Sequence, residues 1–420
     1  MRRTKGRPLF SLSAIGLGFV AIALPFLSNR IRNDVALAKV VWVLLVLRQT
    51  VSLLQVVVGP LPTVNGDPIA FNHAAMGTGY ELFLRNSYAS FLRGIYDALG
   101  GSHLLGCEIS QLGFSIGIVA FVEIHYLLEV NASAARLVLL FGLPPSVLLN
   151  TSVVLREGLQ VGFFLCLVCS LLWIRTGQLL QGLILCLLSG LSLTYLHNGF
   201  GGYLALVLPV SLLWAMRSRP WVMGLAVLIG SVSIIFTGPK VLDFFAQHSE
   251  VVDKALDGRG LEYIGSYQGK VSEGRSAFST ALDTSSTRGF LKTGPIVAVN
   301  YLFAPFPWNV RGVFDVYGLL ESFLRLFLFG CFIRTLVKRR GHVGDALFLF
   351  GMFLSMELVW AAGTANWGTA FRHRVVAWGL LVILGNLGQE GERGAIPVAH
   401  QRMSVRERRR ALRERRSGRG

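Results

Sequence analysis

The fold of this chain is decided at residues 144–158, PPSVLLNTSVVLREG, which lie between apolar runs of membrane-spanning character. Proline removes a backbone donor and clashes with the preceding helical turn, so a helix arriving from Arg136 is expected to break near Pro144. The adjacent Arg156 and Glu157 then open the next apolar run. A charge pair at the start of a membrane-embedded helix is costly and marks a functional candidate. The simpler alternative is an arginine that anchors a helix end by snorkelling to the interface.

The composition is that of a membrane protein. The 420 residues are 53% hydrophobic and 15% charged, with a mean hydropathy of +0.56, whereas soluble domains are about 25% charged. Apolar segments of about 18 or more residues recur along the whole chain. The sequence therefore predicts an all-α, polytopic membrane protein and excludes a soluble one.

We expect about eleven transmembrane helices within a domain that covers residues 1–392. The candidate spans are residues 9–28, 37–59, 109–129, 135–147, 158–174, 179–196, 201–216, 221–238, 313–335, 343–362 and 375–389. The fourth is short, and its proline pair predicts a broken or re-entrant segment, buried in protein or lining a water-filled cavity. Long loops are expected at about 59–107 and 239–312. In the first, the apolar spacing over 80–99 predicts an amphipathic helix, lying on the interface or packed on the bundle.

The net charge of +17 is concentrated towards the C-terminus, where residues 393–420 are rich in arginine. We interpret this segment as a disordered cytoplasmic tail that fixes topology, with an RNA-binding tail as the less favoured alternative. The basic loops at 217–219 and 334–340 agree with that orientation, while the basic N-terminus does not. This orientation places the two long loops on the periplasmic side. It places residues 144–157 and 363–374 on that side as well.

Several common chemistries lack their motifs. The sequence has no Gly-rich Walker loop, no GxGxxG after a strand, no GxSxG elbow and no convincing metal-ligand spacing. Cys166 and Cys169 have CxxC spacing, but they fall in mid-helix and are interpreted as packing residues. We therefore expect no cofactor, no metal and no nucleic-acid partner.

What remains is a set of ionisable residues at the predicted periplasmic face. The catalytic candidates are Arg156, Glu157, His197, Arg275, Arg372 and Arg374. Arginine forks hold phosphate bidentately and stay charged, so several in one cavity would suit a lipid diphosphate. Donors aimed at developing charge stabilise a transition state, and a carboxylate or histidine could take a proton from an attacking hydroxyl. Interface anchoring and helix-end roles are the alternatives for each residue taken singly.

Substrate-binding candidates lie in the same predicted periplasmic segments. They are Asp67, His73, Trp308, Asn366 and His373. Trp308 belongs to an aromatic group that predicts either a headgroup-level belt or a stacking wall for sugars.

Together these segments resemble a known family. The carrying residues are Pro145-Ser146 followed by Arg156-Glu157, Gly274-Arg275, Pro305-Phe306-Pro307-Trp308, and the run from Asn366 to Arg374. From about Asp67 to Arg374 the chain resembles bacterial oligosaccharide repeat-unit polymerases, the O-antigen and exopolysaccharide group of membrane glycosyltransferases. Essential periplasmic arginines are a feature of that family.

The resemblance implies an enzyme of surface polysaccharide biosynthesis in the bacterial inner membrane, with its C-terminus in the cytoplasm. Its substrate would be an undecaprenyl-diphosphate-linked oligosaccharide, polymerised at the periplasmic face beside membrane lipid. A chain-length regulator is a further partner that the resemblance allows. Two alternatives remain open: a polyprenyl-phosphate-sugar-dependent GT-C-type transferase or O-antigen ligase, and a transporter or flippase for lipid-linked sugars.

Overall fold

The structure is a computed structural model, and it describes residues 9–59, 66–78, 87–217, 262, 265–266, 277–278, 282–338 and 343–388. Within these ranges the regular elements are helices, and an isolated antiparallel bridge joins Ala277 to Asn366. The predicted all-α class is confirmed. The chain divides into two compact units, Met1–Gly388 and Gln389–Gly420. The second unit, and with it the predicted basic tail, lies outside the described residues.

Seven of the described helices are long and apolar enough to cross a membrane. They are α3 (Val35–Val57), α7 (His103–Leu127), α10 (Glu157–Thr176), α11 (Leu179–Leu196), α12 (Asn198–Met216), α17 (Val313–Lys338) and α18 (Val343–Ala362). Shorter apolar helices are α1 (Leu12–Ala23), extended by a 3-10 turn at Leu24–Leu27, and α20 (Val375–Asn386). These are the helices of a polytopic membrane protein. The predicted span at 221–238 lies outside the described residues, and the total of eleven stays a prediction.

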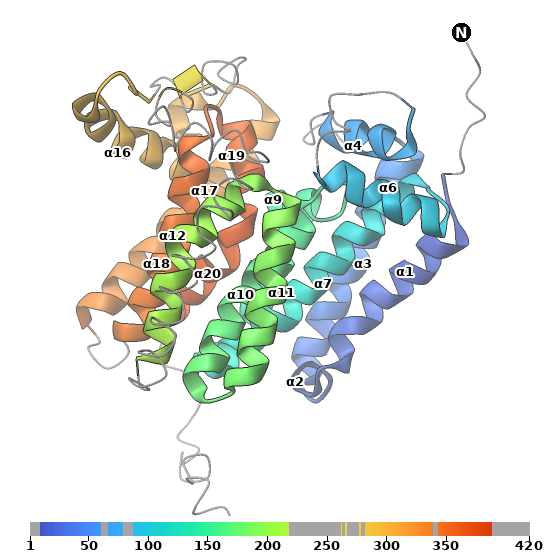
Figure 1. The fold of residues 1–420 in the computed structure, drawn as a ribbon, viewed down its shortest axis with the longest axis horizontal. Helices are drawn as coiled ribbons and strands as arrows, with labels where there is room; N and C mark the ends of the chain where they lie inside the picture. Colours follow the sequence, from blue (N-terminus) through green and yellow to red (C-terminus); the bar gives the residue numbers. More distant parts are fainter. Residues whose placement is uncertain are drawn as a thin grey trace, which may run out of the picture. The chain divides into compact units, whose positions relative to one another are not determined.

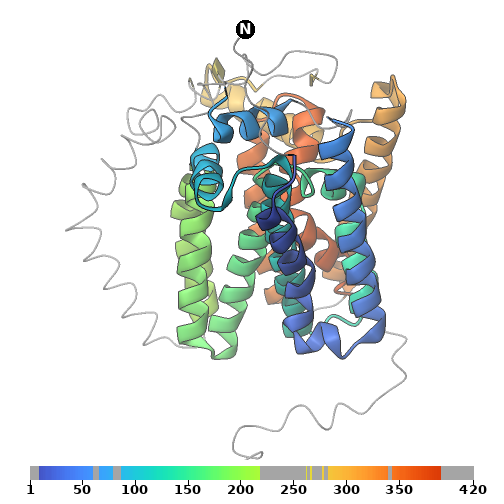
Figure 2. The ribbon, with the colours of Figure 1, turned by 90° about the vertical axis from the view of Figure 1, so that its right-hand side faces the viewer.

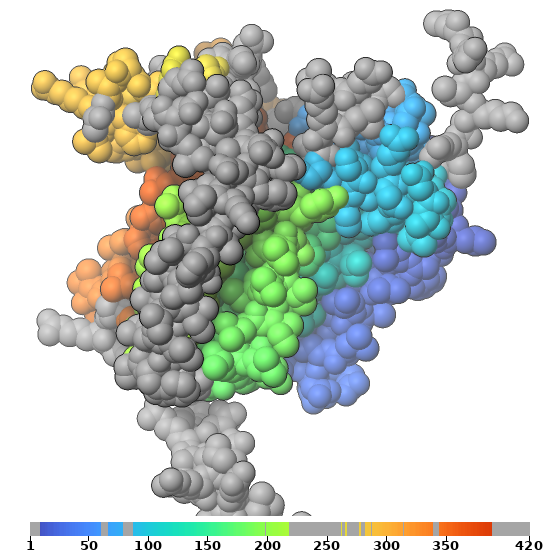
Figure 3. All heavy atoms as spheres, viewed as in Figure 1, coloured from blue at the N-terminus to red at the C-terminus, as the bar shows by residue number. Residues whose placement is uncertain are grey.

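The most buried of the seven helices, α7 and α10, pack against each other, and α10 also packs against α11 (Figure 1). Glycines permit the α7–α10 contact: a Cβ added at Gly113 would meet the backbone of Leu159, and one at Gly158 would meet the carbonyl of Ser110. Small residues let helix backbones approach closely in this way in membranes. By contrast, α11 (green in Figure 3) exposes Leu180 by 72%, which suits a lipid-facing surface.

Two helices, α4 (Asp67–Met76) and α6 (Ser87–Leu99), lie across the ends of the longer helices (Figures 1 and 2). The amphipathic helix predicted over 80–99 is confirmed from Ser87 onward, because α6 buries Tyr88 and Tyr96 on one face. Tyr96 Oη donates a hydrogen bond to Asn72 Oδ1 of α4 at 2.9 Å. This packing favours the alternative of a helix held on the bundle.

The remaining described elements are short or lie near the ends of the spans. They are α2 (Asn29–Arg32), α8 (Ala134–Gly142), α9 (Pro145–Asn150), α16 (Thr287–Phe303), the 3-10 turn Pro307–Asn309, and α19 (Trp367–His373). In Figure 1, α9 and α19 lie at the same end of the bundle as α4 and α6.

The break predicted near Pro144 is confirmed. Pro144 has an extended ψ of 135°, as expected for a residue that precedes a proline. The predicted span 135–147 is therefore not one helix: α8 ends at Gly142 after nine residues, and α9 begins separately at Pro145. Six non-helical residues then connect α9 to Glu157, the first residue of α10.

Arg48 of α3 satisfies part of the interrupted backbone. It is fully buried, and its Nη2 donates to the carbonyl of Gly142 at 2.8 Å, at the end of α8. Its Nε donates to Thr151 Oγ1 at 3.3 Å, just after α9, and its guanidinium lies 3.6 Å from the ring centroid of Phe114. One arginine thus joins both sides of the break.

Other neighbours satisfy further groups of the same segment. Ser52 Oγ of α3 donates to the carbonyl of Ser152 at 2.5 Å. The backbone N–H of Ser146, in the first turn of α9, donates to Glu321 Oε1 of α17 at 2.7 Å. Irregular backbone at membrane depth is tolerated when protein groups satisfy it in this way.

We expect Arg48→Ala to lower the melting temperature of the purified protein in detergent. The substitution leaves buried acceptors unsatisfied, at a cost of about 1–3 kcal/mol for each group. The control is Arg30→Ala, because Arg30 pairs with Glu123 at 3.1 Å with its side chain 37% exposed, and surface pairs contribute about 0–1 kcal/mol. Equal melting temperatures for the two variants would contradict this role for Arg48.

Candidate functional site

A buried ion-pair network joins three segments that are far apart in sequence. Arg372 of α19 donates from Nε to Glu157 Oε1 and from Nη1 to Asp67 Oδ2. Glu157 is fully buried in the first turn of α10, where the helix dipole favours a negative charge. Asp67 opens α4, and its side chain is 42% exposed. Burial acts to lower the pKa of Arg372, but Glu157 and Asp67 outweigh it and raise that pKa, so the guanidinium stays charged.

The two carboxylate oxygens of Glu157 differ in their hydrogen bonding. Its Oε1 accepts from Arg372, whereas Oε2 is buried and has no hydrogen-bond partner among the residues that the structure describes. An unsatisfied carboxylate oxygen in a buried site is costly and needs an explanation.

A second arginine lies beside this network. Arg156 precedes Glu157 at the start of α10, and its guanidinium is 6.0 Å from the ring centroid of Phe71 on α4. Both Arg156 and Arg372 act electrostatically on His197 and His373. The structure therefore brings six predicted residues into one charged cluster, comprising Asp67, Arg156, Glu157, His197, Arg372 and His373.

Both histidines contact the indole of Trp360. The ring of Trp360 is 4.8 Å from that of His197 and 4.2 Å from that of His373, centroid to centroid. His373 Nδ1 lies 2.9 Å from Thr364 Oγ1. Burial, followed by the nearby arginines, holds the pKa of each histidine well below its usual value of 6.5. Both rings are therefore neutral at pH 7.

A local hydrogen bond fixes the tautomer of His197. Its Nδ1 accepts from the backbone N–H of Gly199 at 2.9 Å, which caps the start of α12. The neutral ring must then carry its proton on Nε2 and present a donor to its surroundings. Nε2 of His197 therefore carries a proton and can donate a hydrogen bond.

Arg374 does not join the charged cluster. It is buried, and it donates from Nη1 to the carbonyl of Ala304 at 2.9 Å and from Nη2 to that of Asn300 at 3.4 Å. Its guanidinium lies 5.4 Å from the ring centroid of Tyr301. Arg374 thus holds the end of α16, and its expected role in phosphate binding stays a prediction.

The other predicted residues are placed separately. His73 lies on the exposed face of α4, with Nδ1 3.1 Å from Thr78 Oγ1. Asn366 caps α19, because its Oδ1 accepts from the N–H of Thr369 at 2.7 Å. Trp308 is 76% exposed and belongs to the 3-10 turn. Arg275 lies outside the described residues.

Sequence reasoning missed a second set of buried charges. Arg325 of α17 and Glu357 of α18 approach to 3.5 Å, and both act electrostatically on Arg374. Each is a charge within a predominantly apolar span, which is a recognised signal of function or tertiary pairing. Trp360, between the histidines, gave no such signal because an aromatic residue is ordinary in a membrane helix.

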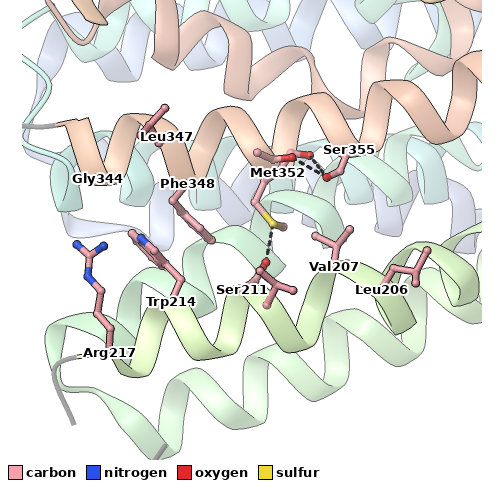
Figure 4. A pocket seen from close by; sticks show the side chains of 12 residues that line it. Leu206, Val207, Ser211, Trp214, Arg217, Gly344, Leu347, Phe348, Met352 and Ser355 are labelled. Carbon is pink, nitrogen blue, oxygen red and sulfur yellow. Dashed lines mark hydrogen bonds between the residues drawn. The ribbon is translucent and has the colours of Figure 1, made fainter. Parts of the chain in front are cut away.

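A hollow of about 500 Å³ lies between α12 and α18, away from the predicted site residues. Figure 4 shows Arg217 at one end of this hollow, with Trp214 beside Phe348 and Ser211 bonded to Met352. The rings of Trp214 and Phe348 stack with centroids 3.7 Å apart, and Ser211 Oγ donates to Met352 Sδ at 3.1 Å. The groove is mainly apolar and carries no acid or base in its middle.

Within the described ranges, no three His, Cys, Asp or Glu side chains gather where they could hold a metal ion. Comparisons of the chain with protein-family models, with curated proteins and with solved structures find no match.

We expect the stability of the folded protein to fall as the pH decreases below 6.5. The unfolded chain binds protons at His197 and His373 in that range, while the folded protein keeps both neutral because their pKa values are lowered. Each histidine can contribute a slope of at most about 1.4 kcal/mol per pH unit. Melting temperatures measured from pH 7.5 to 5 should fall less steeply in a His197→Asn/His373→Gln double variant. An unchanged slope would contradict the buried neutral state.

Proposed function

We propose that this protein is an integral-membrane glycosyltransferase that polymerises undecaprenyl-diphosphate-linked oligosaccharide repeat units. The observation that supports it best is the ion pair of Arg372 with Glu157, whose second oxygen is buried without a hydrogen-bond partner among the described residues, with Arg156 next to Glu157 in the chain. In this proposal the arginines bind the diphosphate, and the carboxylate takes the proton of the attacking hydroxyl. The proposal includes a site at the periplasmic face of a bacterial inner membrane and a cytoplasmic C-terminus.

The proposed reaction is a displacement at an anomeric carbon. A hydroxyl of one lipid-linked oligosaccharide attacks the anomeric carbon of the reducing-end sugar of another. A new glycosidic C–O bond forms, the C–O bond to the lipid diphosphate breaks, and the diphosphate leaves with the electron pair. Oε2 of Glu157 takes the proton of the attacking hydroxyl. Arg156, Arg372 and the Nε2–H of His197 stabilise the charge that grows on the diphosphate.

Binding requires Arg372 to exchange a partner. In the network described above, two carboxylates occupy its guanidinium. Glu157 is fully buried and Asp67 is 42% exposed, so an incoming diphosphate would replace Asp67 at lower cost. Asp67 then serves as a placeholder that keeps the arginine compensated between turnovers.

The competing functions make different use of the same residues. A polyprenyl-phosphate-sugar-dependent transferase or an O-antigen ligase would share the arginines and the base but differ in donor or acceptor. A flippase would bind the diphosphate and form no bond. Assay of the purified protein with both donor types, and of lipid scrambling in liposomes, separates these cases.

We expect Arg372→Ala, made in a polymer-producing host, to reduce long polysaccharide chains to single repeats. Loss of one preorganised donor to developing charge typically lowers turnover about 10²–10³-fold. The matched control is Arg93→Ala, because Arg93 lies on α6 with its side chain 52% exposed and pairs with Asp97. Chain lengths are read on gels, and membrane content is checked by immunoblot. Normal chains from an Arg372→Ala protein that remains in the membrane would refute the proposal.

We expect Asp67→Asn to strengthen binding of inorganic diphosphate to the purified protein by about tenfold, equivalent to about 1.4 kcal/mol. The substitution removes a carboxylate that competes with the anion for Arg372. Asp97→Asn makes the same change of charge on α6, where the side chain is 65% exposed, and should leave the affinity unchanged. Titration calorimetry provides the measurement. Equal or weaker binding in Asp67→Asn would argue against the exchange of partners.

A further inference from the structure

A separate cleft lies beyond the charged cluster, where the end of α16 and the 3-10 turn meet the start of α19. Its volume is about 240 Å³. Aromatic rings and two side-chain amides dominate its lining, which includes Phe278, Phe306, Trp308, Trp367, Asn300 and Asn309. We call this the aromatic cleft. Neither the arginines nor the carboxylate of the proposed reaction line it.

The wall that carries Trp308 is held by local bonds. The N–H of Phe306 donates to Asn309 Oδ1 at 3.1 Å, and the N–H of Asn309 donates back to the carbonyl of Phe306 at 2.8 Å. The rings of Phe306 and Trp308 stack with centroids 4.9 Å apart and planes 16° apart. Trp308 is nonetheless 76% exposed. The turn therefore presents a broad indole that is braced by a second ring.

The opposite wall belongs to the hydrophobic cluster under the cleft. Trp367 is 9% exposed and packs edge-on against Phe371, with ring centroids 5.7 Å apart. Ala304 completes this small cluster, and Phe306 packs against it. Both walls are thus fixed to one support, so the cleft is formed before any ligand arrives.

We propose that the aromatic cleft is a saccharide-binding subsite that takes one sugar ring. The C–H face of a pyranose carries partial positive charge and matches the negative face of an indole. The amides of Asn300 and Asn309 offer donors and acceptors of the kind that sugar hydroxyls need. An apolar lipid chain would instead offer no partner to the Nδ2–H groups of these amides. The volume suits a single ring, because sites for drug-sized ligands span about 300–1,000 Å³.

The position of the subsite relative to the charged cluster follows from α19. Trp367 opens this helix and Arg372 lies five residues later, about 7.5 Å along the axis. One short helix therefore carries a wall of the cleft and the arginine of the cluster. If the proposed function holds, on which this step rests, the bound ring belongs to the oligosaccharide within a few sugars of the diphosphate.

Saturation-transfer difference NMR on the purified full-length protein in detergent tests the subsite directly. The probes are glucose, galactose and N-acetylglucosamine, each at millimolar concentration. We expect ring-proton saturation of at least one sugar with the wild-type protein and with Trp308→Phe, which retains a ring. Trp308→Ala should weaken that binding about tenfold or more, as expected when an aromatic stacking partner is truncated. Trp42→Ala is the control, because Trp42 is 55% exposed on α3.

The same measurement separates this inference from the proposed function. Arg372→Ala should keep sugar saturation whichever activity the charged cluster supports, whereas it should lose polymer formation only if the proposed function holds. The subsite is refuted if no sugar is saturated by the wild-type protein, or if Trp308→Ala and Trp42→Ala bind equally. It is also refuted if glycerophosphocholine, a headgroup probe, is saturated in place of the sugars.

Discussion

The structure depends on how a broken backbone is satisfied among apolar helices. The proline pair after α8 frees carbonyl and N–H groups that water cannot reach. Arg48 donates hydrogen bonds on both sides of the break, to the carbonyl of Gly142 and to Thr151 Oγ1. Glu321 accepts a hydrogen bond from the N–H of Ser146. Because these bonds hold α9 and the link after it, α10 starts inside the bundle. Glu157 is therefore buried at a helix N-terminus, a position that a continuous helix would not have provided.

That position determines the electrostatics of the charged cluster. Burying a carboxylate is costly unless a cation and hydrogen bonds compensate it. Arg372 supplies both to one oxygen of Glu157, and the start of α10 adds the favourable end of a helix dipole. The other oxygen has no hydrogen-bond partner among the described residues. Asp67, which is partly exposed to solvent, forms a second ion pair with Arg372. The network is thus buried on the side of Glu157 and exposed to solvent on the side of Asp67, and the proposed exchange of partners depends on this difference.

Features that depend on neighbouring residues in the chain could be predicted from the sequence. Contacts between residues far apart in the chain could not. Proline geometry gave the break, and apolar periodicity gave α6 and the long helices. The contact between Arg372 and Asp67 crosses 305 residues and has no local signature. Arg372 and Arg374 looked equivalent in sequence, yet residues two apart on a helix point about 200° apart. One therefore faces Glu157 and the other the end of α16. Arg48 was missed because an arginine in an apolar run also suits snorkelling.

The second oxygen of Glu157, which is buried and has no hydrogen-bond partner among the described residues, favours the proposed enzyme over a carrier. A carrier that grips a diphosphate with Arg156 and Arg372 gains nothing from an unsatisfied carboxylate beside them, because like charges repel. The same oxygen is useful to an enzyme, which must remove a proton from a hydroxyl while a phosphate ester leaves. The tautomer of His197 points the same way, since a donor beside the arginines stabilises growing negative charge. In the proposed displacement the acceptor, the donor and the cations each have a role, whereas binding alone would need only the cations.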